Sequence, residues 1–338
     1  MAKQQRIGIL FGPFDPVSRA LIRAGQDFMD RGEADLLLLM PIADSAEAVA
    51  EDRWKMLVAA CACDERLVPS RFLLDSHEPA PSSVSVKKLR KEYPCACFAI
   101  MAAGQPDASA AEARVSLASG VLSELLDYPV REYCRCKGLY GFPGRINRID
   151  PWMEKLFSAL KPKRYAHSLS VAWTAVHLAE LYGLDVQRAE QAGLLHDCAK
   201  CLPLKDMQKL AAEHSLTEDE TILANPGLLH SLAGAWIAQH EYGMTDPQVL
   251  DAIACHNTGR AGMTRLSMCV CLADSIEPLR RSFPLLDHVR ALAEQSLEKA
   301  LLASLEGTAS YVSSHNCFLH PQTQETIRWL KSLPETQD

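Results

Sequence analysis

Hydrophobic and polar positions change their spacing partway along this 338-residue chain. Over residues 1–140, short apolar runs typical of buried strands alternate with segments of helical periodicity. The strand-like runs are RIGILFG, ADLLLLMPI and CFAIMAAG, and the helical segments between them include SRALIRAGQDFMDRG and EDRWKMLVAAC. This alternation predicts a parallel sheet flanked by helices, which is an α/β fold.

The second half of the chain has helical periodicity throughout and predicts an all-α domain. Apolar residues recur at i, i+4 and i+8 in RYAHSLSVAWTAVHLAELYG, and glycines end the segments GLLHSLAGAWIAQHEYG and VLDAIACHNTG. Between the halves, KGLYGFPGRINRIDPWMEKLF contains three glycines and two prolines, and Asp150 with Pro151 is typical of a helix start. We therefore predict two domains, residues 1–145 and 146–338.

Six potential metal ligands lie in these helical segments. His196 and Asp197 are adjacent in AEQAGLLHDCAK, and Asp274 is the first carboxylate of the apolar stretch MCVCLADSIEPLR. A buried ionised carboxylate is costly unless a cation or a partner compensates it. Taken singly, such residues are as typical of helix caps and satisfied backbone groups as of ligands. Together they favour iron, manganese or zinc binding, with a carboxylate able to bridge two ions. The set is His167, His196, Asp197, His230, His256 and Asp274.

The order H…HD…H…H…D resembles the HD-domain metal phosphohydrolases. The segments RYAHSLSVAWTAVHLAELYGLD, AGLLHDCAK, LLHSLAGA, YGMTDPQVLDAIACHNTG and LADSIEPLR are similar to the YqeK-type branch, over residues 155–300. The resemblance implies cleavage of diadenosine tetraphosphate to two ADP at a paired metal centre usually described as iron, with manganese or another first-row metal as the alternative. It also implies that His167, His196, Asp197 and Asp274 hold one ion and that His230 and His256 hold the second, with Asp197 bridging.

A tetraphosphate substrate requires cations at the mouth of such a site. Lys200 follows His196 by one helical turn, so we expect it to bind substrate and to act with Asp197 in catalysis; the alternative is a solvated lysine at a helix C-terminus. For the other candidates, surface or capping roles fit equally well. They are Arg164, Asn257, Thr258, Arg260, Arg280 and Arg281. One departure from the family is Met268, which stands at a position that is often basic and is none of the six ligands.

The first half resembles the nicotinate-nucleotide adenylyltransferases of the nucleotidyltransferase superfamily. The similar segments are ILFGPFDPV, RWKML, SSVSVKKLRKEYP and YPVREYCRCKGLYG, and the resemblance implies a Rossmann-like nucleotidyltransferase fold. However, Ser18 and Leu21 stand where that family has histidines, Ala20 replaces its glycine, and residues 102–104 read Ala-Ala-Gly instead of Gly-Ala-Asp. We therefore expect the adenylyltransferase activity to be lost, and the domain to be a structural partner, a nucleotide sensor or an interface.

Composition and charge narrow the remaining choices. The chain has 48% hydrophobic and 23% charged residues, no run long enough to cross a bilayer and no signal peptide, so we expect a cytoplasmic protein without a membrane partner. Its formal charge of −7 argues against nucleic-acid binding and favours a dinucleotide or nucleotide substrate. A homodimer is kept as a hypothesis for its assembly. Four C-x-C pairs are interpreted as small buried residues instead of zinc ligands; they are Cys61/Cys63, Cys95/Cys97, Cys134/Cys136 and Cys269/Cys271.

The leading functional hypothesis is a metal-dependent hydrolase of dinucleoside polyphosphates, in which a metal-activated water attacks the substrate. Two alternatives are a non-enzymatic nucleotide-binding or regulatory protein, and an HD phosphohydrolase that acts on another nucleotide phosphate ester. Six intact ligands favour an enzyme, because a site without turnover would not need to keep them while the first domain has lost its reactive groups.

Overall fold

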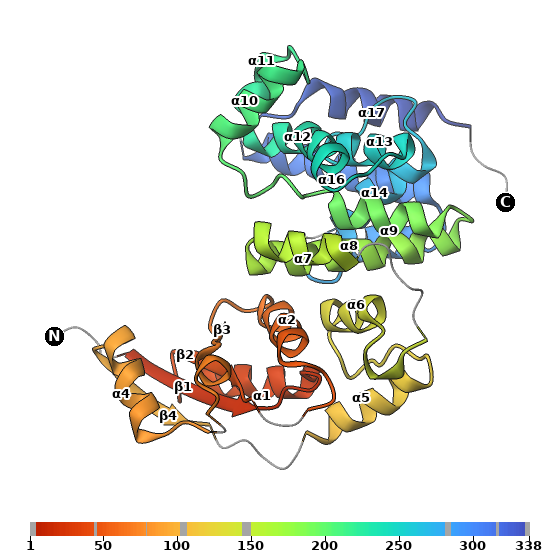
Figure 1. Ribbon diagram of the computed structural model, residues 1–338. Helices are drawn as coiled ribbons and strands as arrows, with labels where there is room; N and C mark the ends of the chain where they lie inside the picture. The colour runs from red at the N-terminus through yellow and green to blue at the C-terminus, as the bar shows by residue number, and fades with distance from the viewer. Residues whose placement is uncertain are drawn as a thin grey trace. The chain divides into compact units, whose positions relative to one another are not determined.

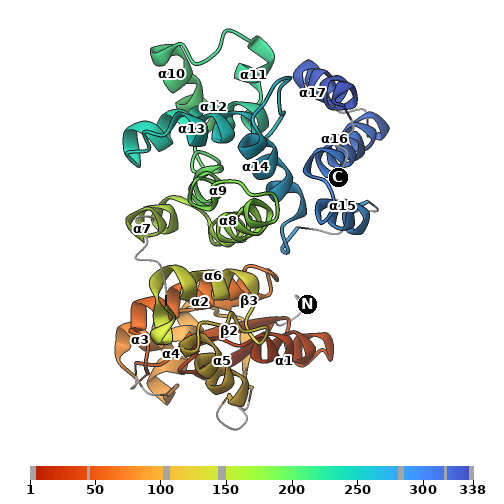
Figure 2. The same cartoon turned by 90° about the vertical axis from the view of Figure 1, so that its right-hand side faces the viewer.

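The computed structural model describes residues 5–43, 46–78, 80–101, 107–143, 150–280, 285–315 and 318–334. The chain divides into two compact units, residues 1–150 and 151–338. Figures 1 and 2 show that the first contains a sheet and that the second is helical, which confirms both predicted fold classes. The boundary expected near residue 145 lies outside the described residues, as do residues 102–104 and Arg281.

The first unit is built on a parallel four-stranded sheet in the order β3-β2-β1-β4. The strands are β1 (Gln5–Gly12), β2 (Leu36–Pro41), β3 (Leu67–Pro69) and β4 (Ala96–Ile100). In the register, Ile9 of the central strand β1 pairs with Leu38 of β2 and with Ile100 of β4. Ile9 and Leu38 are buried in the same core cluster, since a parallel sheet covered by helices needs nearly continuous apolar runs.

The helices of this unit precede or follow the strands as the alternating pattern predicts. They are α1 (Arg19–Asp30), α2 (Ala50–Cys61), α3 (Phe72–Ser76), α4 (Ser83–Glu92), α5 (Ala108–Ala118), α6 (Tyr128–Lys137) and the short 3₁₀ helix η1 (Leu139–Gly141). Ser18, at the position of a family histidine, is buried and caps α1, because its hydroxyl oxygen accepts the Leu21 N–H at 3.2 Å. Its side chain is therefore used for structure.

The turn after β1 is stabilised by hydrogen bonds of two buried charged side chains, Asp15 and Arg53. The buried carboxylate of Asp15 accepts the Glu47 N–H at 2.6 Å, the Ala48 N–H at 3.1 Å and the Tyr140 hydroxyl at 2.6 Å. The buried guanidinium of Arg53 donates to the carbonyl groups of Pro13 at 2.7 Å, Ile42 at 3.0 Å and Ala48 at 3.2 Å. These bonds satisfy two buried charged groups and fix the turn.

Some of the C-x-C cysteines are buried and others are exposed. Cys61, Cys134, Cys269 and Cys271 are buried free thiols, as predicted, but the prediction is wrong for Cys63, Cys95 and Cys97, which are exposed. Cys97 lies on β4, which is an edge strand of the sheet within the described residues, and Cys63 follows the end of α2. The side chain of Cys136 lies outside the described residues.

The second unit consists of helices in the part of the chain that the structure describes. They are α7 (Asp150–Ala159), α8 (Pro162–Leu181), α9 (Val186–Leu195), α10 (Leu204–His214), α11 (Glu220–Ala224), α12 (Pro226–Glu241), α13 (Pro247–Cys255), α14 (Arg265–Ile276), α15 (Leu286–Ala293), α16 (Leu297–Ser314) and α17 (Pro321–Ser332). Helix α8 packs against α9 and α14, and α13 packs against α9, α12 and α14 (Figure 2). No helix in the described ranges combines the length and apolarity that a bilayer-spanning segment needs.

A close approach between α8 and α9 depends on Gly193. A Cβ atom at this position would lie 2.8 Å from the Cα atom of Ala172 and 3.1 Å from its backbone nitrogen. Backbone atoms cannot move aside as a flexible side chain can, so the two helices approach this closely only because residue 193 has no side chain.

We expect Gly193→Ala to lower the free energy of unfolding by about 1–3 kcal/mol, since overpacking forces the two helices apart. Urea denaturation followed by circular dichroism measures this change. Gly234→Ala is the matched control, because a Cβ there would have its nearest neighbour at an ordinary 3.5 Å. Equal stability of Gly193→Ala and the wild type would contradict the argument.

Candidate metal centre

All six predicted ligands converge in the helical unit. His167 lies on α8, His196 ends α9 and is followed by Asp197, His230 lies on α12, His256 ends α13, and Asp274 lies on α14. Five of them are buried and Asp274 is partly buried. Three overlapping groups have potential ligand atoms within 4.8 Å of one another: His167–His196–Asp197, His196–His256–Asp274 and Asp197–His230–His256.

The carboxylate of Asp197 lies between two pairs of imidazoles. Its Oδ2 atom is 3.4 Å from Nε2 of His196 and 3.7 Å from Nε2 of His167. Its Oδ1 atom is 3.1 Å from Nε2 of His230 and 3.7 Å from Nε2 of His256. Oδ1 is buried and accepts no hydrogen bond from the described residues. A buried carboxylate oxygen without a donor, facing imidazole nitrogens, fits a cation ligand.

The four imidazole rings are oriented from outside the centre. Nδ1 of His196 donates to the Gly193 carbonyl at 2.7 Å, and Nδ1 of His256 donates to the Ile253 carbonyl at 2.7 Å. Nδ1 of His230 is 3.2 Å from the Pro226 carbonyl oxygen. These bonds assign the proton to Nδ1 and leave the Nε2 lone pair for a metal.

The spacing of the Nε2 atoms also suits shared ions. Nε2 of His196 is 3.3 Å from Nε2 of His167, and Nε2 of His230 is 3.1 Å from Nε2 of His256. Ligand nitrogens about 2.1 Å from a zinc-like ion and at right angles to each other are about 3 Å apart. The residues present therefore fit divalent metal ions.

Glu277 belongs to the site although the sequence analysis gave it no role there. It is buried, its Oε1 is 3.0 Å from Nδ1 of His167, and its Oε2 accepts the Leu279 N–H at 2.6 Å. A carboxylate that accepts from the far nitrogen of a metal-binding histidine fixes its tautomer and raises its basicity. The available signal was a second carboxylate three residues after Asp274 in an apolar stretch.

The charge states of the two carboxylates and of His256 suit metal binding, whereas His167 must release a proton to bind an ion near neutral pH. Burial disfavours the charged forms of Asp197 and Asp274. The neighbouring His196 nevertheless holds the pKa of the Asp197 carboxyl well below its usual range, and His167 does the same for the pKa of Asp274. Burial, together with His196 and His230, lowers the pKa of His256 to about 3. For His167, burial acts in the opposite direction to the hydrogen bonds to Asp274 and Glu277, which raise its pKa to about 9. Ionised carboxylates and neutral imidazoles are the forms that bind metals.

Three of the predicted cations border the ligands. Nη1 of Arg164 is 2.5 Å from Oδ2 of Asp197, and Nζ of Lys200 is 3.0 Å from Nε2 of His230 and 3.7 Å from Oδ1 of Asp197. Nη1 of Arg280 is 3.4 Å from Oδ1 of Asp274. Each of these cationic side chains is partly exposed, so each can reach both the ligands and solvent.

The other predicted substrate contacts have partners elsewhere. Arg260 forms an ion pair with Asp251 at 2.7 Å, the Asn257 amide donates to the Gly227 carbonyl, and the Thr258 hydroxyl donates to the Gly259 carbonyl at 3.0 Å. These contacts stabilise the loop after His256, and a role of these residues in substrate binding stays a prediction.

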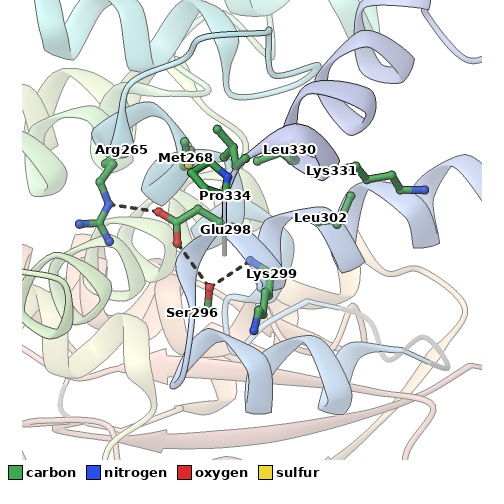
Figure 3. A pocket seen from close by; sticks show the side chains of 10 residues that line it. Arg265, Met268, Ser296, Glu298, Lys299, Leu302, Leu330, Lys331 and Pro334 are labelled. Atoms are coloured by element: carbon green, nitrogen blue, oxygen red, sulfur yellow. Dashed lines mark hydrogen bonds and ion pairs between the residues drawn. The ribbon is translucent and has the colours of Figure 1, made fainter. Parts of the chain in front are cut away.

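A cavity of about 480 Å³ lies between α14, α16 and α17 (Figure 3). None of the six metal-ligand candidates lines it. Met268, the departure from the family pattern, lies in its wall together with Arg265, whose Nε is 3.3 Å from Oε1 of Glu298. The substitution at residue 268 therefore affects this cavity and not the six potential ligands.

Comparison with known proteins agrees with this geometry. Residues 164–279 match the HD domain family. The chain is 40% identical over 173 residues to the symmetrical bis(5'-nucleosyl)-tetraphosphatase of Bacillus subtilis. The aligned region covers 51% of this chain and 92% of that relative. A crystal structure of a predicted HD superfamily hydrolase involved in NAD metabolism from Clostridium acetobutylicum is similar with a TM-score of 0.53 and 39% identity, over 55% of this chain and 98% of that one.

A further relative has a name that combines an adenylyltransferase with a hydrolase. The chain is 30% identical over 190 residues to the probable nicotinate-nucleotide adenylyltransferase/Ap4A hydrolase of Mycoplasma genitalium. The aligned region covers 54% of this chain and 50% of that relative. Homologues of the helical unit thus occur fused to an adenylyltransferase, the family that the first half of this chain resembles.

We expect Glu277→Gln to weaken metal binding about 10- to 100-fold, the effect typical of losing a carboxylate behind a histidine ligand. Competition against a fluorescent chelator measures the affinity. Glu294→Gln is the matched control, because Oε1 of Glu294 is also 3.0 Å from a histidine nitrogen, of His177, in an exposed pair outside the cluster. Unchanged affinity in Glu277→Gln would show that this carboxylate does not support His167.

Proposed function

Because the helical half of this chain belongs to the HD-domain family of symmetrical bis(5'-nucleosyl)-tetraphosphatases, we propose that it hydrolyses diadenosine tetraphosphate to two ADP at a dinuclear metal centre. The observation that carries this proposal is the buried Asp197 carboxylate, which presents one oxygen to His167 and His196 and the other to His230 and His256. Two ions, one on each side of this carboxylate, would use every potential ligand in the cluster.

In this assignment His167, His196, Asp197 and Asp274 would hold one ion, and His230, His256 and the shared Asp197 would hold the second. Iron is the preferred metal and manganese the first alternative, since imidazole and carboxylate ligands suit both. When bound, such a pair of ions supplies a nucleophile from water near neutral pH and neutralises charge on the attacked phosphoryl group.

The chain's own cations bind and orient the tetraphosphate. Arg164, Lys200 and Arg280 lie around the ligands on their partly exposed side, where charge-assisted hydrogen bonds can hold phosphate oxygens. In the reaction the oxygen of one water bonds to an inner phosphorus atom and the bond from that phosphorus to the central bridging oxygen breaks. One ADP leaves with the bridging oxygen, the other ADP keeps the oxygen of the water, and a proton is released to solvent. Lys200, closest to the His230 side, is placed to donate to an oxygen of the attacked group.

For the first unit we propose a structural role without adenylyl transfer. Ser18 is committed to capping α1, and neither Ala20 nor Leu21 can supply an imidazole. The carboxylate of Asp15 and the guanidinium of Arg53 are already bonded within the turn after β1. These contacts support a stable turn and leave the hydrolytic chemistry to the helical unit.

We expect the wild-type protein, purified without oxygen and supplied with Fe²⁺ or Mn²⁺, to convert diadenosine tetraphosphate to ADP. In Asp197→Ala, metal content and ADP formation should both be lost, because the variant removes the carboxylate shared by both ion sites. Metal analysis and chromatography of the products measure the two effects. ADP formation by Asp197→Ala at the wild-type rate would refute the proposed centre.

We expect Lys200→Ala to lower kcat about 100- to 1,000-fold while two ions remain bound, the cost typical of losing one donor to the charge that develops in a transition state. Steady-state kinetics and metal analysis separate these effects. The control is Lys209→Ala, whose exposed side chain is 3.8 Å from Glu213 on α10. Wild-type kcat in Lys200→Ala would exclude a catalytic role for this lysine.

A further inference from the structure

His256 stands at the junction between a packed helix, α13, and the loop that follows it. His167, Asp274 and His196 lie on or at the end of helices that pack directly on one another, α8, α14 and α9. His256 is the C-cap residue that follows α13, and the chain then runs outside helices through residues 257–264 before α14 begins. The position of His256 therefore depends on the packing of α13 and also on what holds the segment that follows it.

Helix α17 holds that segment through two side chains. The Gln322 amide donates to the Gly259 carbonyl at 2.8 Å, and the Thr326 hydroxyl lies 3.1 Å from the Thr258 carbonyl oxygen and 2.8 Å from that of Gln322. Thr326 is fully buried. Its single hydroxyl proton is shared between the two carbonyl groups, so the amide of Gln322 makes the stronger of the two tethers.

Gly259 allows this close approach. Its φ of +62° is in the left-handed region, and a Cβ atom there would lie 2.6 Å from Cγ2 of Thr326. The loop backbone therefore packs directly against α17, which requires a glycine both for conformation and for space.

The same loop is bonded to α12, the helix that carries His230, the other histidine assigned to the second ion. The Asn257 amide donates to the carbonyl of Gly227, in the first turn of α12, and Nδ1 of His230 on that helix is 3.2 Å from the Pro226 carbonyl oxygen. At the start of α17, Nε2 of His320 is 3.2 Å from Oδ2 of Asp219, which caps α11, the helix before α12. Helix α17 thus contacts the loop after His256 directly, and it is linked to α12, which carries His230, through that loop and through the cap of α11.

We propose that α17 is a positioning element of the metal centre, which through Gln322 and Thr326 sets the affinity of the ion held by His230 and His256. The inference rests on the proposed function, because it concerns the second ion of that centre. Helix α17 lies beyond residues 164–279, the part that matches the HD family model. Its far end, at Leu330 and Lys331, borders the cavity of Figure 3, which none of the six potential ligands lines.

The test compares the full-length wild type with the double variant Gln322→Leu/Thr326→Val, which removes both tethers and keeps similar side-chain volumes. Mn²⁺ titration followed by electron paramagnetic resonance distinguishes one bound ion from a spin-coupled pair. We expect two ions in the wild type. In the variant we expect an unchanged first ion and a second ion bound about 10- to 100-fold more weakly, as for other losses of support behind a ligand.

Thr323→Val is the matched control, because Thr323 is also buried on α17 and, within the described part of the chain, its hydroxyl forms no hydrogen bond to residues 257–259. It should keep both ions at wild-type affinity, and Thr326→Ser, which retains the hydroxyl, should do the same. If the double variant does not fold, Gln322→Leu alone gives the same comparison, since that side chain is only partly buried.

The outcomes separate the two proposals. A coupled pair in the wild type and an equally tight pair in the tether variants would overturn the role of α17 and leave the proposed function intact. A wild type that binds no metal pair and forms no ADP would refute the proposed function, and the inference would fail with it. Equal weakening of both ions would show a general loss of packing and would also overturn a specific role for α17.

Discussion

The helical unit depends on the compensation of one buried carboxylate. Asp197 is almost fully inaccessible, and its two oxygens face imidazole nitrogens that come from four helices or helix ends. Removing an ionised carboxylate from water costs several kcal/mol unless charges or hydrogen bonds replace its hydration. Within the described residues, Arg164 and Lys200 supply part of that replacement, and metal ions would supply the rest.

The ends of helices make this arrangement possible. His196 and His256 both follow the last residue of a helix, and each donates from Nδ1 to a carbonyl three residues earlier. Carbonyl groups in the last turn of a helix have no amide partner further along, so they are free to orient a ring. The rings then point their Nε2 atoms inward without help from any dedicated side chain. His167 lies inside α8, away from its C-terminal turn, and its Nδ1 faces the Glu277 carboxylate instead.

The two units differ in whether their buried charged groups are fully hydrogen-bonded. In the first, Asp15 and Arg53 are saturated by backbone amides, carbonyl groups and the Tyr140 hydroxyl, so the turn after β1 is a closed structural element. In the second, Oδ1 of Asp197 has no donor among the described residues. A satisfied buried charge stabilises a fold, whereas an unsatisfied one among metal-binding groups indicates that a ligand completes the site.

The sequence by itself determined the two fold classes and the six potential ligands, because both depend on local spacing. Apolar periodicity decides strand or helix, and a carboxylate or histidine inside an apolar helix must be compensated wherever the helix packs. It could not separate Arg164, Lys200 and Arg280, which border the ligands, from Arg260, Asn257 and Thr258, which have partners elsewhere.

Nor could it identify Glu277 and α17 as supports, or Cys97 as exposed. Those properties are decided by which segments distant in sequence pack together, and only the tertiary structure brings residue 326 to residue 258 and residue 277 to residue 167.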